Sequence, residues 1–247
     1  MSFYPLRYLP TGHVFIDPAD DCDKVVDALL ETDYSEEFCL ARDFDTDFAG
    51  RLMEAGFLVM STEIKGEDDN SEAGTEEIPA ERFFILLPKL HLVRSVLLFP
   101  ELHIKKSIRR FLSHYELRID TDFEKILDKC VQTHGDAWLT PPLVGILKSL
   151  RERRNMRVRP VSFAVYREGE LKAGEIGIVT GRVYTSYSGY YGEDNAGTVQ
   201  MILMAQWMKE TGFDFLDFGM PLNYKTDLGA RDIDPGLFVE LFRAARY

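Results

Sequence analysis

VSFAVYREGELKAGEIGIVTGRVYTSY, residues 161–187, alternates apolar and polar side chains through much of its length. Turn residues interrupt the alternation twice, at Glu168–Glu170 and at Gly181–Arg182. A side-chain period of two is typical of β-strands, and short turns that contain glycine join antiparallel neighbours. The stretch therefore predicts a meander of three antiparallel strands over residues 161–167, 171–180 and 183–187.

Helical patterns flank this predicted sheet. Apolar residues at helical spacing predict helices over 104–114, 122–133 and 143–153 before the meander and over 195–211 after it, followed by a strand over 215–218. Further upstream, helices are expected over 20–31 and 46–55, and strands over 57–62 and 83–87. Helices, a meander, a long helix and a strand, in this order, indicate an α+β fold of the acetyltransferase (GNAT) type with a mainly antiparallel sheet.

The charge of the chain changes sign along its length. The net charge is -12 over 247 residues, but residues 1–81 carry 21 acidic and 5 basic side chains, whereas residues 82–247 carry 20 acidic and 24 basic ones. Segment 63–81 is polar and acidic, lacks the apolar surface needed to order itself, and is interpreted as a linker. We therefore predict a small acidic α/β domain over 1–81 and an acyltransferase-like domain over 82–247.

Composition excludes several classes of protein. No run of 18 or more apolar residues occurs, and the N-terminus lacks the pattern of a signal peptide, so we expect a cytoplasmic protein. Its three cysteines lack metal-binding spacing, and no Walker, zinc-protease or dinucleotide-binding motif is present. These observations predict a protein without a metal or a cofactor.

Two basic clusters stand out in the second predicted domain. Residues 103–110 contain Lys105, Lys106, Arg109 and Arg110, and residues 148–159 contain Arg151, Arg153 and Arg154 among others. Charged runs of this kind are usually solvated helix faces. Such clusters also bind the phosphates of nucleic acids. Whether these two clusters are solvated helix faces or phosphate-binding sites stays open at this point.

Four sequence blocks resemble one protein family. SVLLFPELHIKKSIRRFL (95–112), DAWLTPPL (136–143), GELKAGEIGIVTGRVY (169–184) and GFDFLDFGMPLNYKTDLGA (212–230) follow the order found in the bacterial leucyl/phenylalanyl-tRNA–protein transferases. The resemblance implies transfer of leucine or phenylalanine from aminoacyl-tRNA to the N-terminus of a protein or peptide. Such a reaction is the aminolysis of an ester, which needs a route for the amine proton and donors for the developing oxyanion.

The resemblance also assigns candidate site residues. Asp217 keeps an aspartate of the family's last strand, and Tyr187 stands where the family has a glutamate; both are candidate catalytic residues. A carboxylate inside an apolar strand needs either an arginine partner or a role at a site, because its burial is costly. The candidate substrate pocket comprises Trp138, Glu175, Tyr184, Ser188, Tyr190 and Gly219, and the implied tRNA-binding residues are Lys105, Lys106, Arg109, Arg110, Arg151, Arg153 and Arg154.

Two other functions remain open. Tyr187 and Gly219 replace a glutamate and a glutamine of the family, which favours a protein that binds tRNA or peptide N-termini without catalysis. The second alternative function is that of an acyltransferase that uses another donor. This donor could carry a cationic aminoacyl group if Glu175 lines the pocket. Coenzyme A is disfavoured as donor because Glu193 and Asp194 precede the long helix and would repel its phosphates.

Overall fold

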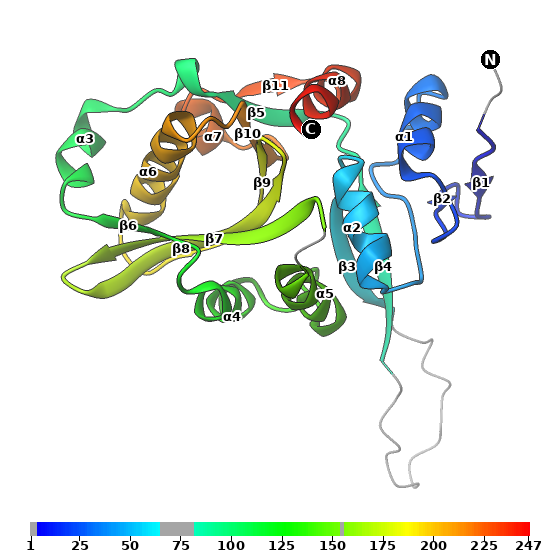
Figure 1. Ribbon diagram of the computed structural model, residues 1–247, viewed down its shortest axis with the longest axis horizontal. Helices are drawn as coiled ribbons and strands as arrows, with labels where there is room; N and C mark the ends of the chain where they lie inside the picture. The colour runs from blue at the N-terminus through cyan, green and yellow to red at the C-terminus, as the bar shows by residue number, and fades with distance from the viewer. Residues whose placement is uncertain (1–3, 65–81, 154–155) are drawn as a thin grey trace, which may run out of the picture.

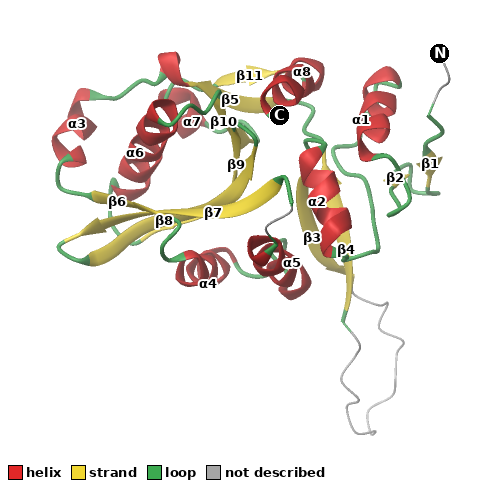
Figure 2. Ribbon diagram, viewed as in Figure 1, coloured by secondary structure: helices red, strands yellow, loops and turns green. Residues whose placement is uncertain are grey.

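The computed structural model describes residues 4–64, 82–153 and 156–247. Figures 1 and 2 show the arrangement of its helices and strands. In chain order the elements are β1 (Arg7–Tyr8), β2 (Val14–Phe15), α1 (Cys22–Glu31), α2 (Thr46–Glu54), β3 (Leu58–Ile64), β4 (Phe83–Lys89), β5 (Arg94–Leu98), the short 3-10 helix η1 (Phe99–Glu101), α3 (Lys106–Leu112), β6 (Glu116–Ile119), α4 (Phe123–His134), α5 (Pro141–Glu152), β7 (Val158–Arg167), β8 (Glu170–Thr180), β9 (Val183–Tyr191), α6 (Ala196–Glu210), β10 (Phe215–Gly219), α7 (Asn223–Asp227), β11 (Arg231–Ile233) and α8 (Pro235–Ala245).

A seven-stranded sheet forms the centre of the molecule. Its strand order is β11-β5-β10-β9-β8-β7-β6, and every neighbouring pair is antiparallel except β9 and β10, which run parallel. The predicted meander is confirmed as β7, β8 and β9, the predicted helix over 195–211 as α6, and the predicted final strand as β10. The expected α+β class with a mainly antiparallel sheet is therefore confirmed.

Two apolar cores lie on opposite faces of this sheet. In Figure 1, α4 and α5 cover one face and α6 covers the other. Neighbouring residues of one strand alternate between the cores: Ala164 belongs to the core on the α4 and α5 side, here called core A, and Phe163 to the core on the α6 side, core B. Such alternation follows from the pleat of a strand, which points successive side chains to opposite faces.

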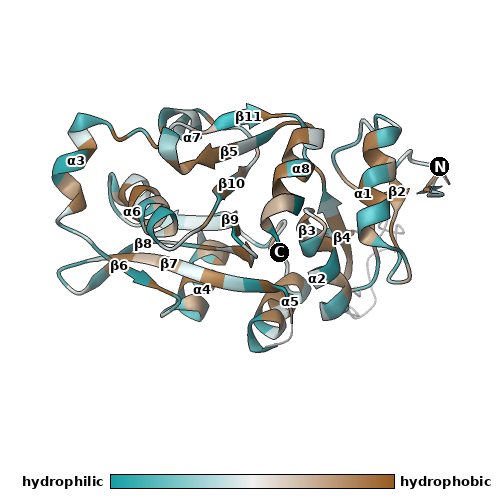
Figure 3. Ribbon diagram, turned by 45° about the horizontal axis from the view of Figure 1, so that its top comes forward, coloured by the Kyte–Doolittle hydropathy of each residue, from teal (hydrophilic) through white to brown (hydrophobic). Residues whose placement is uncertain are grey.

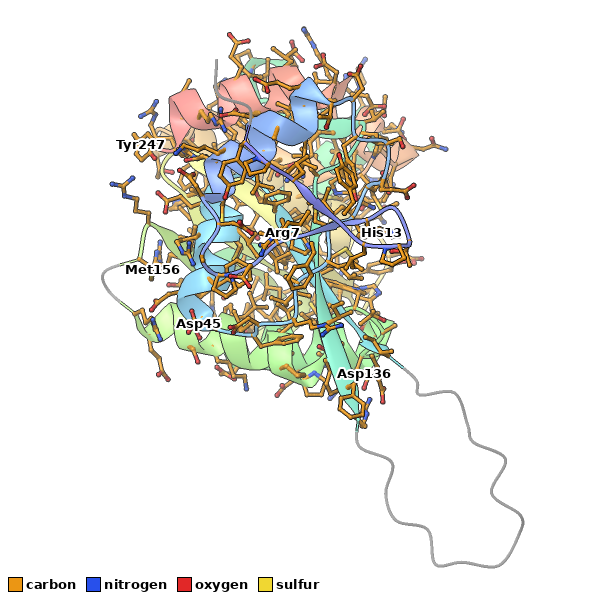
Figure 4. The ribbon with its side chains drawn as sticks, turned by 90° about the vertical axis from the view of Figure 1, so that its right-hand side faces the viewer. Arg7, His13, Asp45, Asp136, Met156 and Tyr247 are labelled. Carbon is orange, nitrogen blue, oxygen red and sulfur yellow. The ribbon has the colours of Figure 1, made fainter. Side chains whose placement is uncertain are left out.

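The helices supply one apolar face each to these cores. Helix α5 buries Leu143, Ile146, Leu147 and Leu150, which stand at positions i, i+3, i+4 and i+7 and so share one face. Figure 3 shows both hydrophobic and hydrophilic residues along this helix. Helix α2 begins at Thr46, and the carboxylate of the preceding residue, Asp45, accepts a hydrogen bond from the Phe48 N–H at 2.8 Å. Asp45 is labelled in Figure 4 beside that helix.

Strands β3 and β4 pair from Leu58 opposite Lys89 to Ile64 opposite Phe83. The predicted boundary at residues 81 and 82 falls in the connection between these strands, and residues 65–81 of the predicted linker lie outside the described residues. Core A contains side chains from both predicted domains, for example Phe48 and Leu147. The division into two domains stays a prediction.

No helix in the described ranges is both long and apolar enough to cross a membrane.

Candidate active site

The two parallel strands at the centre of the sheet diverge. Strand β10 pairs with β9 only from Phe215 to Asp217, opposite Val183 to Thr185. Beyond that point β9 continues beside β8 to Tyr191, whereas β10 stays beside β5 and ends at Gly219. A register irregularity between Asp217 and Gly219 marks the separation, since a β-bulge bends the strand that contains it.

Asp217 lies at this divergence as half of a buried ion pair. Its carboxylate is fully buried and accepts two hydrogen bonds from the Arg94 guanidinium, from Nε at 2.8 Å and from Nη2 at 2.6 Å. Oδ1 also accepts the Gly219 backbone N–H at 2.9 Å, and the guanidinium stacks on the Phe238 ring at 4.2 Å. The structure therefore supplies the arginine partner that a buried aspartate needs.

Tyr187, the other candidate catalytic residue, lies near the same ion pair. The Val59 N–H donates a hydrogen bond to its phenol oxygen at 3.0 Å. Burial raises the pKa of this phenol above its ordinary value, and the charges of Arg94 and Asp217 act on that pKa in opposite directions. The structure thus brings the two candidate catalytic residues to one region.

A bulge in β9 divides the candidate pocket residues between the two faces of the sheet. Ser186 pairs with Gly177 and Ser188 with Ile176, so Tyr187 is an extra residue on β9. Without it, Tyr184 and Tyr190 would share a face; with it, Tyr184 packs in core B and Tyr190 in core A. The sequence alternation alone could not show this change of face.

The remaining candidate pocket residues follow the same division. Trp138 packs partly buried against core A, and its carbonyl accepts the Ser61 N–H at 3.1 Å. Ser188 is buried and its carbonyl accepts from the Cys130 thiol at 3.4 Å, while Gly219 ends β10 with φ of 72°. The six candidate pocket residues therefore do not lie in a single pocket.

Glu175 points to the α6 face of the sheet and is 4% exposed. Burial raises the pKa of its carboxyl group from 4.5 to about 7, while the nearby polar groups of Ser186, Tyr184 and Gln200 and the positive charge of Lys225 act to lower it. Among the residues that the structure describes, Oε1 of Glu175 and the phenol oxygen of Tyr184 have no partner that meets hydrogen-bond geometry. The carboxyl group is thus buried without full compensation.

We expect the stability of the protein to fall as pH rises through the pKa of Glu175. Because its pKa is about 7 in the fold and 4.5 ordinarily, the stabilisation is complete below pH 4.5 and is lost as the buried group ionises. Glu175→Gln should match the wild type at pH 4 and exceed its free energy of unfolding by about 3 kcal/mol at pH 8. Urea unfolding at both pH values measures this difference, and a difference that does not change with pH would contradict it.

Lys225 and His91 belong to the same region and are absent from the sequence prediction. Lys225 is 5% exposed, and its ammonium group donates hydrogen bonds to the carbonyls of Phe218 at 2.7 Å and Met220 at 2.8 Å. His91 is 4% exposed, and neither ring nitrogen has a partner within the described residues. Burial, followed by the charges of Arg94, Lys89 and Lys225, lowers the pKa of His91 to about 2, so its ring is neutral.

Lys225 lies inside the sequence block 212–230, where its position directly after the Asp217 motif was an available signal. His91 carries no comparable signal in the sequence, because an isolated histidine in an apolar stretch has no characteristic spacing.

The first basic cluster is largely free of carboxylates. Lys106, Arg109 and Arg110 are exposed on α3 and have no acidic partner among residues 4–64, 82–153 and 156–247. Lys105 pairs with Asp227 at 2.6 Å. Their charge is therefore available to an anionic partner.

The second basic cluster is mostly neutralised. Arg151 forms an ion pair with Asp120, and Arg153 with Asp47. Arg154 lies outside the described residues. The acidic first part of the chain thus supplies a carboxylate to one of these arginines.

The cysteine thiols and the potential metal-binding side chains form no further candidate site among the described residues. Cys22, Cys39 and Cys130 are buried, and burial raises their pKa values to about 11, about 12 and about 12, so the thiols stay protonated. Within the part of the chain that the structure describes, no group of three or more His, Cys, Asp or Glu side chains could hold a metal ion.

Comparison with known proteins identifies similar sequences over the central and C-terminal parts of the chain. The sequence model of the leucyl/phenylalanyl-tRNA protein transferase family matches residues 96–243. The chain is 32% identical over 152 residues to the leucyl/phenylalanyl-tRNA–protein transferase of Pseudomonas entomophila. This alignment covers 60% of this chain and 66% of that protein. It is 26% identical over 169 residues to the leucyl/phenylalanyl-tRNA–protein transferase of Maridesulfovibrio salexigens, and this alignment covers 66% of this chain and 65% of that protein. The chain thus spans slightly less than two thirds of these relatives.

Among solved structures, the chain is similar to FemX, with a TM-score of 0.45, 11% identity and coverage of 93% of this chain and 81% of that chain.

Proposed function

Because the chain belongs to the leucyl/phenylalanyl-tRNA protein transferase family, we propose that it transfers an amino acid from aminoacyl-tRNA to the N-terminus of a protein. The observation that carries this proposal is the family match over residues 96–243, which includes α3, the β7 to β9 meander, α6 and β10. The proposed donor amino acid is leucine or phenylalanine, as in the names of the similar proteins.

The proposed reaction is an ester aminolysis. The amine nitrogen of the acceptor attacks the ester carbonyl carbon, a C–N bond forms, and the bond to the ribose oxygen of the tRNA breaks. Negative charge develops on the carbonyl oxygen, and the amine loses a proton. A fold that catalyses this step must hold hydrogen-bond donors and charged groups in fixed positions beside the ester.

We assign Asp217 and Tyr187 to positioning within this site. Both carboxylate oxygens of Asp217 accept hydrogen bonds from Arg94, and one also accepts the Gly219 N–H, so both oxygens are engaged within the protein. It fixes the end of β10 and lies near the Tyr187 phenol. An aspartate whose two oxygens are both bound by groups of the protein itself holds these groups in place, which supports an indirect role.

The tRNA is proposed to bind along α3. Lys106, Arg109 and Arg110 are exposed there, so they can approach phosphates in spite of the net charge of -12. Because Arg151 and Arg153 already pair with aspartates, we expect them to contribute less.

A transfer assay tests the proposed function. The wild-type protein is incubated with a pool of tRNAs charged with radiolabelled amino acids and with peptides that differ in their first residue; acetylated peptides serve as the matched control, since they lack the attacking amine. We expect label to move to the free peptides only, and the label transferred identifies the donor.

Binding of tRNA without transfer would support instead a protein that recognises tRNA on a transferase fold, which the ion pair between Asp217 and Arg94 favours, because it engages both carboxylate oxygens. A protein that neither transfers label nor binds tRNA would overturn the proposal.

A further inference from the structure

Lys225 is a buried cation beside the point where β9 and β10 diverge. Its neighbours Tyr224 and Thr226 are exposed, yet Lys225 itself turns inward from α7 and is 5% exposed. Two of its three N–H bonds are directed to the carbonyls of Phe218 and Met220. The third has no acceptor within the described ranges, so this ammonium group retains a free hydrogen-bond donor.

Glu175 faces the same region from β8 and carries the opposite charge when it ionises, above its pKa of about 7. Each of the two groups shifts the pKa of the other, yet they form no ion pair within the described residues. Buried opposite charges usually contact one another, because burial of a charge without a partner is costly. Within residues 4–64, 82–153 and 156–247, Oε1 of Glu175 and the phenol of Tyr184 also lack a partner in hydrogen-bond geometry. Unused donor and acceptor capacity therefore gathers on the α6 face of β8 and β9.

We propose that Lys225 and Glu175 together bind the aminoacyl ester of the donor, with Lys225 donating to the ester carbonyl oxygen and Glu175 accepting from the α-amino group. This inference rests on the proposed function. An α-amino ester places a cationic donor nitrogen and a carbonyl acceptor oxygen three bonds apart, which complements one ammonium and one carboxylate. A phosphate would be repelled by Glu175, and an apolar side chain would leave both charges without partners.

Lys225 acts directly on the charge that develops in the reaction. When the acceptor nitrogen bonds to the carbonyl carbon, the carbonyl electron pair moves to oxygen, beside the Lys225 ammonium. When the electron pair returns, the bond to the ribose oxygen breaks, and the proton lost by the attacking nitrogen passes to that oxygen. A fixed cation stabilises the tetrahedral intermediate more than the neutral ester, so it lowers the barrier.

The charge of Lys225 is sensitive to pH near neutrality. Burial lowers its pKa from 10.5 to about 8, while Glu175, Asp217 and Asp232 raise it and Arg94 lowers it. His91 and Tyr224 also lie near it; the His91 ring is neutral in this range, and burial raises the pKa of the Tyr224 phenol, so that it stays protonated. The ammonium is therefore present below pH 8 and disappears as pH rises through 8, and the interaction with the carbonyl disappears with it.

Transfer kinetics on the full chain test the role of Lys225. Lys225→Met should lower kcat about 100-fold with a smaller change in KM, because a donor used in the transition state is removed. Lys225→Arg keeps a charge that does not titrate, so the ratio of its rate to that of the wild type should rise above pH 8. Lys209→Met, at an exposed lysine of α6, is the matched control and should leave the rate unchanged.

A donor analogue tests the role of Glu175. The wild type should use N-acetylated aminoacyl-tRNA at least about 10-fold less well than the free amine form, since acetylation removes a charge-assisted hydrogen bond. Glu175→Gln should lose this preference, whereas Glu210→Gln, at an exposed glutamate of α6, should keep it.

The outcomes separate this inference from the proposed function. A wild type that transfers nothing overturns the proposed function and this inference with it. An active wild type with Lys225 and Glu175 variants that behave like their controls overturns this inference alone. Thermal unfolding of each variant checks the fold; if Lys225→Met does not fold, the pH profile of Lys225→Arg and the analogue preference of Glu175→Gln decide.

Discussion

Replacing Asp217 by alanine is expected to lower the free energy of unfolding by about 3 to 5 kcal/mol. The substitution leaves the Arg94 guanidinium, 1% exposed, without its carboxylate partner in the centre of the sheet. It also removes the acceptor for the Gly219 N–H. Because a domain is typically stable by about 5 to 15 kcal/mol, the loss is a large part of the total. Urea unfolding of the wild type and the variant measures it.

Two controls make this prediction specific. The double variant Arg94→Met/Asp217→Leu should regain most of the lost stability, since an apolar pair can replace a buried ion pair. Glu116→Ala removes a carboxylate from the exposed pair with Arg118 and should cost less than about 1 kcal/mol. An Asp217→Ala variant as stable as Glu116→Ala would show that the buried pair does not support the fold.

This expectation changes how a loss of activity at Asp217 should be interpreted. An inactive Asp217→Ala protein would not distinguish a catalytic group from a structural one. Asp217→Asn keeps the shape and one acceptor for Arg94, so its activity should be compared only with its own folded fraction at the assay temperature.

Replacing Lys106, Arg109 and Arg110 together by glutamine is expected to weaken tRNA binding about 100-fold or more at about 100 mM salt. Each neutralised phosphate releases counterions, so the slope of log affinity against log salt should decrease by about 0.9 for every cation removed, or roughly 3 in total. These three side chains are exposed on α3 and have no acidic partner among the described residues. Filter binding across a salt series measures both quantities.

The paired arginines provide the comparison. Arg151→Gln/Arg153→Gln should weaken binding less than about 3-fold, because Asp120 and Asp47 already neutralise these guanidinium groups. If this variant shows the same decrease in affinity and slope as the α3 variant, the tRNA does not bind along α3 as proposed.

Local pattern was enough to predict most of the main elements. The alternation over residues 161–187 predicts β7, β8 and β9, and helical spacing predicts α4, α5 and α6, because strand and helix periods are written directly in the order of apolar residues. Among the elements that the prediction omits are β1, β2, β6, α7, β11 and α8. Strands as short as β6 and β11 contain too few residues to show a regular alternation of apolar and polar side chains. They are strands because they pair with β7 and β5.

Some residues of the candidate site could likewise be identified from the sequence, and others could not. The sequence singled out Asp217, Tyr187 and Glu175 because their residue types were unexpected at their positions, and the structure places all three near the divergence of β9 and β10. It could not identify Arg94, which is 123 positions from Asp217 in the chain. Nor could it indicate that Lys225 turns inward from a helix whose other residues are exposed.

The sequence by itself determined the strand order of the meander, the helix that follows it and the family, since these depend on periodicity and on motifs read along the chain. Only the tertiary structure decided which side chains meet. One extra residue in β9, Tyr187, reverses the facing of every β9 side chain beyond it, so Tyr184 and Tyr190 lie on opposite faces of the sheet. Facing and pairing depend on the register between strands, which is fixed by packing across the whole sheet.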